Sequence, residues 1–187
     1  MPADADDAGD RGDDAGVVVD RANTDDVDAV ADLWVELARG QRAYGSHLRS
    51  EGNRNAAGDA VARAVVTGGV LVARAADPVA DGGPDSAAAR GVVGFVTFGR
   101  ESGGYRTDVD RGTVYNLYVR PPYRDGGVGA LLLSRAEAAL ADDGADVVGL
   151  EAMAGNVDAI RFYERNGYER HRVELEKSVA GRRNDSD

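Results

Sequence analysis

The sequence predicts a single α/β (α+β) domain with six strand patterns and four helix patterns along the chain. Runs rich in β-branched and aromatic residues have the composition of strands, and they lie at 17–19, 70–75, 92–98, 113–119, 147–153 and 168–179. Longer stretches with apolar residues at helical spacing lie between some of them, at 24–37, 58–66, 128–144 and 156–166. This mixture of helices and strands indicates a domain in which helices pack on a sheet.

The first helix has a recognisable start. Thr24 can cap it, and Asp25 and Asp26 stand in its first turn, where carboxylates interact favourably with the helix dipole. Before it, residues 1–16 are rich in Asp, Ala and Gly, so we expect a disordered acidic tail there. We expect the domain to span 17–179 and residues 180–187 to form a charged tail.

Composition excludes several classes of function. The 33 acidic residues outnumber the 22 basic ones, which argues against non-specific nucleic-acid binding. The acidic excess resembles that of proteins from halophilic archaea, whose carboxylate surfaces keep them soluble in brine. There is no Cys, which excludes disulfides and a Cys nucleophile, and we expect no metal. No apolar run approaches membrane-spanning length and no signal peptide is visible, so we expect a cytoplasmic protein.

The stretch 118–133 predicts a strand, an anion-binding loop and a helix. Pro121 and Pro122 lack a backbone N–H and end the strand ladder. Gly126, Gly127 and Gly129 then allow positive φ and a close approach of the backbone to a ligand. A helix starts at about residue 128, and its first N–H groups favour an anion.

Two common phosphate motifs do not fit this loop. A dinucleotide fingerprint needs a third glycine where Leu132 stands, and a P-loop needs a lysine, but the only lysine is Lys177. The pattern Arg124-x-x-Gly127-x-Gly129 resembles instead the [QR]-x-x-G-x-[GA] signature of the GNAT superfamily of acetyl-CoA-dependent N-acetyltransferases. A glycine-rich turn without a ligand is the alternative.

A second stretch resembles the same superfamily. Residues 156–168 follow the pattern N-x-x-A-x-x-[FL]-Y-x-x-x-G-[FY], and a helix and a strand separate the two motifs as in that family. The resemblance covers about 17–179. It implies a mixed, mostly antiparallel sheet of six to seven strands, flanked by about four helices and splayed at the acetyl-CoA site.

The resemblance also implies roles for individual residues. The loop would hold the pyrophosphate of coenzyme A through the following residues: Arg124, Asp125, Gly126, Gly127, Val128, Gly129 and Ala130. The pantetheine arm would pair with Leu117 and Val119 and contact Asn156. The Leu117 N–H would stabilise the oxyanion, and Tyr163 would protonate the departing thiolate.

Each of these residues also has a purely structural interpretation. Asn156 could only cap a helix, Tyr163 could only fill the core, and Arg124 could be an ordinary surface arginine. For Asn156 the two roles are compatible.

The general base stays open. Strand 113–117 holds no carboxylate, and the candidates are Glu151, Glu101, Asp110, His47 or water.

The acceptor also stays open, between a small-molecule amine and a protein amine. A larger acyl donor or a non-catalytic acyl-CoA sensor are alternatives, and the chain could be a monomer or a homodimer.

Overall fold

The computed structural model describes residues 16–76, 91–101 and 107–178. Its five strands form one sheet in the order β1-β2-β3-β4-β5, and only the β4–β5 pair is parallel. The strands are β1 (Val17–Arg21), β2 (Val70–Ala75), β3 (Val92–Arg100), β4 (Arg111–Val119) and β5 (Val147–Leu150). The α-helices are α1 (Val27–Gln41), α2 (Arg54–Val66), α3 (Val128–Asp142) and α4 (Val157–Arg165).

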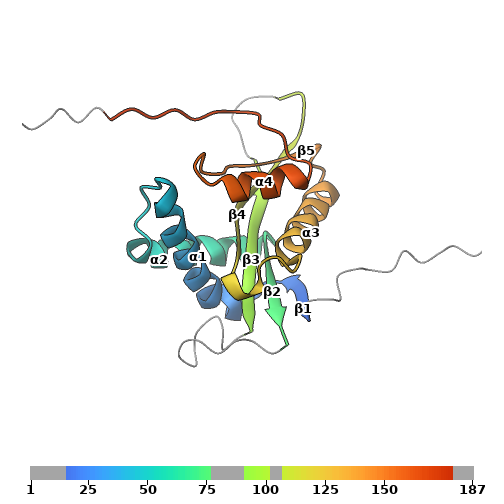
Figure 1. The fold of residues 1–187 in the computed structure, drawn as a ribbon. Helices are drawn as coiled ribbons and strands as arrows, with labels where there is room; N and C mark the ends of the chain where they lie inside the picture. The colour runs from blue at the N-terminus through green and yellow to red at the C-terminus, as the bar shows by residue number, and fades with distance from the viewer. Residues whose placement is uncertain (1–15, 77–90, 102–106, 179–187) are drawn as a thin grey trace, which may run out of the picture.

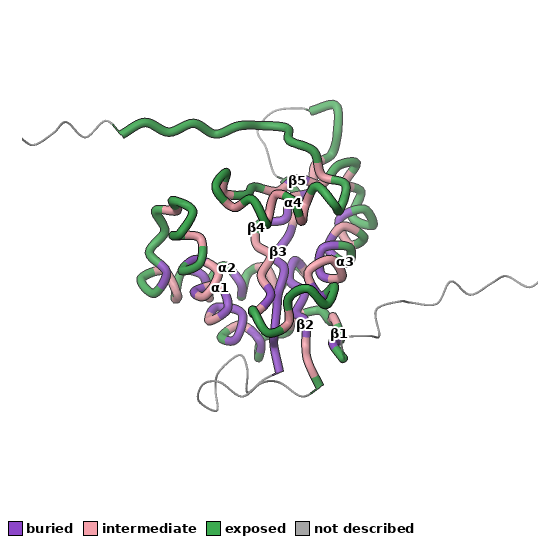
Figure 2. The backbone as a smooth tube through the Cα atoms, in the orientation of Figure 1, coloured by how far each residue is buried: buried purple, intermediate pink, exposed green. Residues whose placement is uncertain are grey.

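Helices cover both faces of the sheet (Figure 1). On one face α1 and α2 pack against Val72, Val92 and Phe95. On the other face α3 buries an apolar stripe against the strands, and α4 adds its aromatic side chains. Because side chains alternate along a strand, each face receives its own apolar set. The central strand β3 is buried on both sides, as the continuous purple of Figure 2 shows.

The sheet opens between β4 and β5. Their parallel pairing begins at Arg111 and ends at Val114, which lies opposite Leu150. Just beyond, β4 has one residue more than β3, because Thr97 pairs with Asn116 while Phe98 pairs with Val114. Tyr115 is therefore the extra residue of a β-bulge, and such bulges bend a strand. From Tyr115 to Val119, β4 has no paired strand on the β5 side among the described residues. The predicted splaying of the two strands stays a prediction.

Most predicted elements are present, with shifted ends. The bounds predicted for β2 are confirmed, while β3 and β4 each gain two residues and α2 begins four residues early. The cap predicted at Thr24 is wrong: Asn23 is the cap, and its side chain accepts from the Asp25 N–H at 2.8 Å. Asp26 accepts from the Asn23 N–H at 2.9 Å and completes a capping box.

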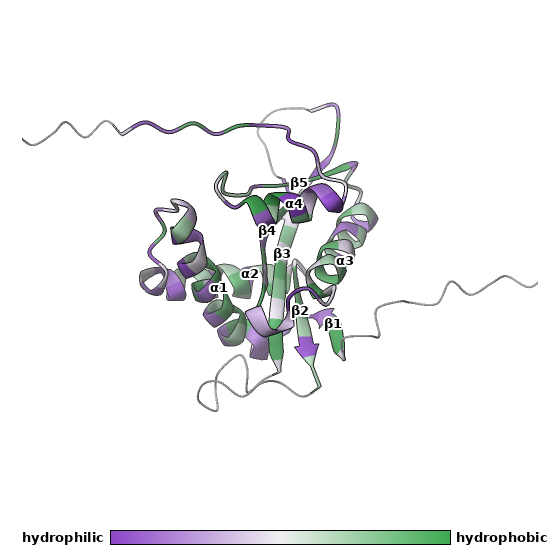
Figure 3. Cartoon of the chain, in the orientation of Figure 1, coloured by the Kyte–Doolittle hydropathy of each residue, from purple (hydrophilic) through white to green (hydrophobic). Residues whose placement is uncertain are grey.

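The strand predicted at 168–179 is wrong for its described part, and the described sheet has five strands instead of six to seven. Residues 168–178 leave α4 as an extended segment outside the sheet, seen as the long red-orange run of Figure 1. Charged and apolar residues alternate from Arg172 to Glu176, which gives this part of the segment the pattern of a strand (Figure 3). A strand also needs a neighbour to hydrogen-bond with, and this segment has none among the described residues.

The expected tails lie outside the described residues, except for Gly16. Every helix in the described ranges is too short or too polar to cross a membrane.

Candidate active site

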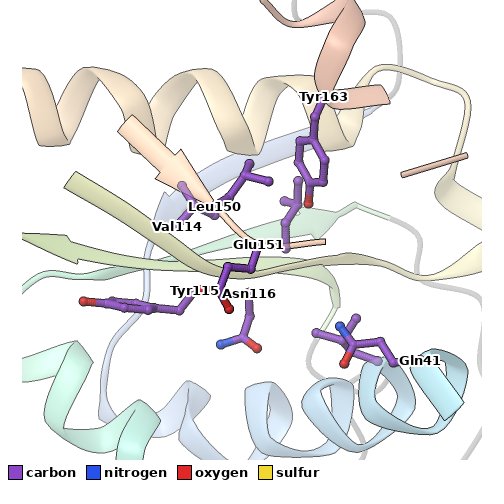
Figure 4. Close-up of a pocket in the computed structure, with 9 residues that line it drawn as sticks. Gln41, Val114, Tyr115, Asn116, Leu150, Glu151 and Tyr163 are labelled. Carbon is purple, nitrogen blue, oxygen red and sulfur yellow. The ribbon is translucent and has the colours of Figure 1, made fainter. Parts of the chain in front are cut away.

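A small hollow opens where the pairing of β4 with β5 ends (Figure 4). Its lining comes from both faces of the sheet and consists of Leu37, Gln41, Val114, Tyr115, Asn116, Leu117, Leu150, Glu151 and Tyr163. In Figure 4, Tyr163 enters from the α4 side and Gln41 from the α1 side, with the strands between them. We call this space the central hollow. Side chains from both faces of the sheet therefore meet at one place.

Tyr163 enters the central hollow from the middle of α4. Its ring packs edge-on against Phe162 and Tyr168, with centroids 5.2 and 5.8 Å away. Burial raises the pKa of Tyr163 to about 12, because a phenolate is poorly solvated there. The hydroxyl therefore keeps its proton at any ordinary working pH.

Glu151 is the carboxylate of the central hollow. It directly follows β5, lines the space with Tyr163 and is exposed to solvent. Among the described residues, no cation forms an ion pair with Glu151, so the arginine partner considered for it is not seen.

The other candidates for the base lie outside the lining. Glu101 pairs with Arg111 at 3.2 Å and Asp110 with Arg100 at 2.9 Å. His47 lies 3.1 Å from Glu176, and both are largely exposed. Of the four side chains considered as the base, Glu151 is the one that lines the central hollow, and the identity of the base stays a prediction.

The backbone of β4 presents polar groups to the gap. Arg120 donates its N–H to the Val93 carbonyl of β3 at 2.9 Å. Because peptide groups alternate along a strand, the N–H groups of Val119 and Leu117 point to the opposite edge. β5 no longer pairs with this part of β4. Both N–H groups therefore face the open side of β4.

Arg124 is held at the end of β4. Its Nε donates to the Val119 carbonyl at 2.8 Å, and its guanidinium lies 5.5 Å from the centre of the Tyr118 ring. Tyr118 in turn donates to Glu36 at 3.0 Å. These contacts hold the arginine beside the glycine-rich loop. The Val119 carbonyl already accepts a hydrogen bond from Arg124.

The glycine-rich loop leads into α3 with unpaired donors. The first helical bond runs from the Leu131 N–H to the Gly127 carbonyl at 3.0 Å. The N–H groups of Val128, Gly129 and Ala130 therefore have no partner within the helix. No side chain caps this end, where Gly127 has a left-handed φ of 82°.

The expected backbone geometry of this loop needs one correction. Gly127 takes positive φ, but Gly126 and Gly129 do not, and Asp125 takes it instead, with φ 63°. A Cβ on Gly129 would point at the Phe162 ring, 3.5 Å away, and not towards open space. A Cβ there would make only an ordinary van der Waals contact with the ring.

Asn156 caps α4. Its Oδ1 accepts from the Ala159 N–H at 3.1 Å, so the structural role weighed for it is confirmed. The side-chain amide nitrogen takes no part in this bond, and a contact with the pantetheine arm stays a prediction.

Six lining residues were not predicted from the sequence: Leu37, Gln41, Val114, Tyr115, Asn116 and Leu150. Asn116 gave a signal, since it is a lone amide in an apolar strand. Its Nδ2 donates to Thr97 at 2.8 Å, so a structural role already accounts for it. The others had no signal, because only the gap between β4 and β5 brings them together.

The arrangement supplies what proton-coupled group transfer needs. A protonated phenol and a carboxylate border one space, and a backbone N–H points into it. An anion-binding helix start follows the same strand, one loop away.

Known proteins resemble this chain in sequence and fold. The model of the acetyltransferase (GNAT) family matches residues 80–168. A GCN5-related N-acetyltransferase from Ralstonia eutropha JMP134 gives a TM-score of 0.63 at 22% identity, covering 89% of this chain and 100% of that one.

Two further solved structures contain coenzyme A. The PaiA N-acetyltransferase from Thermoplasma acidophilum gives a TM-score of 0.63 at 15% identity, over 84% of this chain and 92% of its own. An aminoglycoside N-acetyltransferase gives a TM-score of 0.61 at 14% identity, and the match covers 88% of this chain and 95% of that one. At such identities the likeness establishes the fold alone. No curated protein matches this chain in sequence.

Proposed function

The chain belongs to the acetyltransferase (GNAT) family, and from this premise we propose that it is an N-acetyltransferase. It would move the acetyl group of acetyl-CoA to a primary amine by direct attack on the thioester. The observation that carries the proposal is that Tyr163 and Glu151 line the same hollow, whose lining comes from both faces of the sheet.

The residues present fit acetyl-CoA. The N–H groups of Val128, Gly129 and Ala130 lack helix partners and suit the pyrophosphate, and Arg124 stands beside them. The N–H groups of Leu117 and Val119, turned to the open edge of β4, suit the amides of the pantetheine arm. The Val119 carbonyl already accepts from Arg124, so its N–H is the group we propose for that contact.

Acetyl-CoA supplies an acyl group that is already activated, so no covalent link to the protein is needed. Glu151 accepts a proton from the acceptor amine, directly or through water, because an alkylamine is mostly protonated at neutral pH. The Leu117 N–H donates to the carbonyl oxygen as negative charge develops there.

Tyr163 then donates its proton to the sulfur that leaves. Its high pKa does not oppose this step, because the same burial also raises the pKa of a thiol in the hollow.

The proposal is tested by measuring whether the protein transfers acetyl groups from acetyl-CoA to an amine. Release of free thiol from acetyl-CoA should depend on protein and on one member of a panel of small amines and amino-terminal or lysine peptides. Mass spectrometry should show the acceptor gaining one acetyl group.

Two results would count against the proposal. Binding of acetyl-CoA without turnover on any amine would favour the acyl-CoA sensor instead. Faster turnover with longer acyl donors would replace acetyl by a larger acyl group. Calorimetry adds a control, since neither NADH nor ATP should bind as tightly as acetyl-CoA.

A further inference from the structure

Residues 168–178 form an extended segment with a strand-like sequence and no strand beside it in the described structure (Figure 1). We call it the C-terminal segment. It is green along its length in Figure 2, except at its first residue. Val173 and Leu175 are 80% and 89% exposed, although their spacing is that of one face of a strand. An exposed segment of this kind is a template for pairing with another chain.

The charges of the C-terminal segment are self-complementary. When two copies run antiparallel about a two-fold axis at Val173, residues at equal distances from Val173 face each other. Every charged residue from 169 to 177 then meets its opposite, in the pairs Arg172–Glu174, Arg170–Glu176 and Glu169–Lys177. The two-fold axis makes each pair occur twice. In the same register Val173 faces Val173.

We propose that the C-terminal segment joins two copies of this chain as an antiparallel two-stranded ribbon centred on Val173. Opposite charges that face each other across strands stabilise the pairing, while like charges weaken it. In this register no like charges face each other, and a shift by one residue would lose all three matches.

The two edge strands of the sheet are poorer partners. β1 (Val17–Arg21) has two charged residues, and both already have contacts: Asp20 lies 3.9 Å from Arg74, and Arg21 donates to the Gly68 carbonyl at 3.2 Å. β5 (Val147–Leu150) is four residues long and has no charged residue. Neither edge therefore matches the six charges of the segment, whereas a second copy satisfies all of them.

The present contacts of the segment leave the ribbon possible. Tyr168 donates to Glu137 of α3 at 2.7 Å, which anchors the start of the segment to the body. Arg170 lies 3.6 Å from Glu164 and Glu176 lies 3.1 Å from His47, and both pairs are largely solvent-exposed. Exposed ion pairs are weak and are readily exchanged. The segment is already extended, so little ordering is required on pairing.

The first test measures mass in solution. Sedimentation of the full chain at low salt should show a monomer–dimer equilibrium, because a two-stranded ribbon alone is marginally stable. Added salt should shift it towards monomer, since the pairs are exposed. Arg172→Glu places like charges opposite each other twice and should raise the dissociation constant about tenfold.

A charge swap separates this register from a general effect of charge. Arg172→Glu combined with Glu174→Arg keeps the net charge and restores the opposite pairs, so dimerisation should recover. Arg135→Glu is the matched control, because Arg135 is exposed on α3 and is not part of the segment, and the substitution changes the net charge equally.

A second test fixes the register. The chain has no cysteine, so Val173→Cys introduces a single thiol. Directly opposed residues of an antiparallel pair have Cα atoms about 4.5–5.5 Å apart, within disulfide range. Val173→Cys should give a disulfide-linked dimer under mild oxidation. Ser178→Cys should not, because the two thiols would lie at opposite ends of the ribbon.

The outcomes decide the proposal independently of catalysis, because mass and cross-linking are read without substrate. A monomer at all concentrations overturns it. A dimer that Arg172→Glu does not weaken, or equal cross-linking at positions 173 and 178, also overturns it. A dimer that the charge swap restores and that cross-links at 173 supports it.

Discussion

Tyr163 combines a packed ring with a hydroxyl that has a proton to give. The two roles separate in Tyr163→Phe, which keeps the ring and removes the hydroxyl. We expect kcat to fall by about 10²–10⁴, the usual worth of a positioned acid, with acetyl-CoA affinity nearly unchanged. Steady-state kinetics and calorimetry measure the two quantities. The deficit should shrink with an acyl donor whose thiol is more acidic, since that leaving group needs less protonation.

Tyr168→Phe is the matched control for that variant. The Tyr168 ring packs against Tyr163, but its hydroxyl donates to Glu137, outside the central hollow. Its loss should leave kcat unchanged and lower the melting temperature. If Tyr163→Phe behaves in the same way, Tyr163 is a core residue and not the acid.

The role of Glu151 as the base is tested by how the loss of activity in Glu151→Gln depends on pH. In Glu151→Gln the acceptor amine has no base, so kcat/KM should fall by about 10²–10⁴ near neutral pH. The deficit should narrow as the pH approaches about 10, where an alkylamine loses its proton to solvent. Tyr163, with its pKa of about 12, still holds its proton there, so the comparison reports on the base alone. The measurement is the ratio of kcat/KM between wild type and variant across pH.

Glu101→Gln serves as control for this profile. Glu101 pairs with Arg111 and does not line the central hollow, so its pH profile should follow wild type. A constant deficit of Glu151→Gln from pH 7 to about 10 would show that Glu151 positions the acceptor but does not take its proton.

At the level of elements, the start of α3 carries the expected anion site. Gly127 has φ 82° with open space around the position of a Cβ, so Gly127→Val meets no clash and only backbone strain. That strain is about 1–2 kcal/mol, so the fold should survive. Acetyl-CoA affinity should fall further than the strain explains, because the first N–H groups of α3 move.

Gly167→Val is the matched control for this variant, because Gly167 lies outside the loop before α3. Its φ is 87°, and a Cβ there would also meet nothing within 4 Å. Gly167→Val should lose similar stability in thermal unfolding and keep its affinity in calorimetry. Equal affinities in the two variants would mean that the loop before α3 is only a turn.

Substitutions of Asn156, at the start of α4, can distinguish its role as a helix cap from a contact with acetyl-CoA. Asn156→Asp keeps the oxygen that accepts from the Ala159 N–H and removes the amide donor. We expect the melting temperature to hold and acetyl-CoA affinity to drop about tenfold, the worth of one good hydrogen bond. Asn156→Ala should lose the cap as well, at about 1 kcal/mol of stability. An Asp variant with wild-type affinity would reduce Asn156 to a cap.

The elements differ in how far the sequence could predict them. The bounds of β2 and the cap at Asn156 followed from local patterns, and local interactions produce them. The C-terminal segment has an equally clear strand pattern, yet it lies outside the sheet. A strand is completed by its neighbour, and the pattern of one segment does not say whether a neighbour is present.

The site was predictable where backbone conformation defines it. Glycine spacing identified Gly127, but it also suggested positive φ at Gly126 and Gly129, where Asp125 takes that conformation instead. The choice of Glu151 among five candidates needed the bulge at Tyr115 and the parting of β4 from β5, which depend on pairing between distant segments.

For the molecule as a whole, charge is the dominant long-range term. The net charge is −11, and like charges on a compact body repel. Ions screen this repulsion once the Debye length falls to about 10 Å, near 0.1 M salt. We expect the melting temperature to rise from low salt to about 0.5 M NaCl, by about 2–4 °C for each kcal/mol gained.

A charge-reduced variant tests the cause of that rise. Asp142 and Asp143 are exposed at the end of α3, where carboxylates also face the negative end of the helix dipole. Asp142→Asn with Asp143→Asn should raise the melting temperature at low salt and reduce its further rise with salt. The same salt series should shift the proposed dimer towards monomer, because there salt screens attraction. A melting temperature that falls with salt, in a chain shown to be monomeric, would mean that local ion pairs outweigh the overall repulsion.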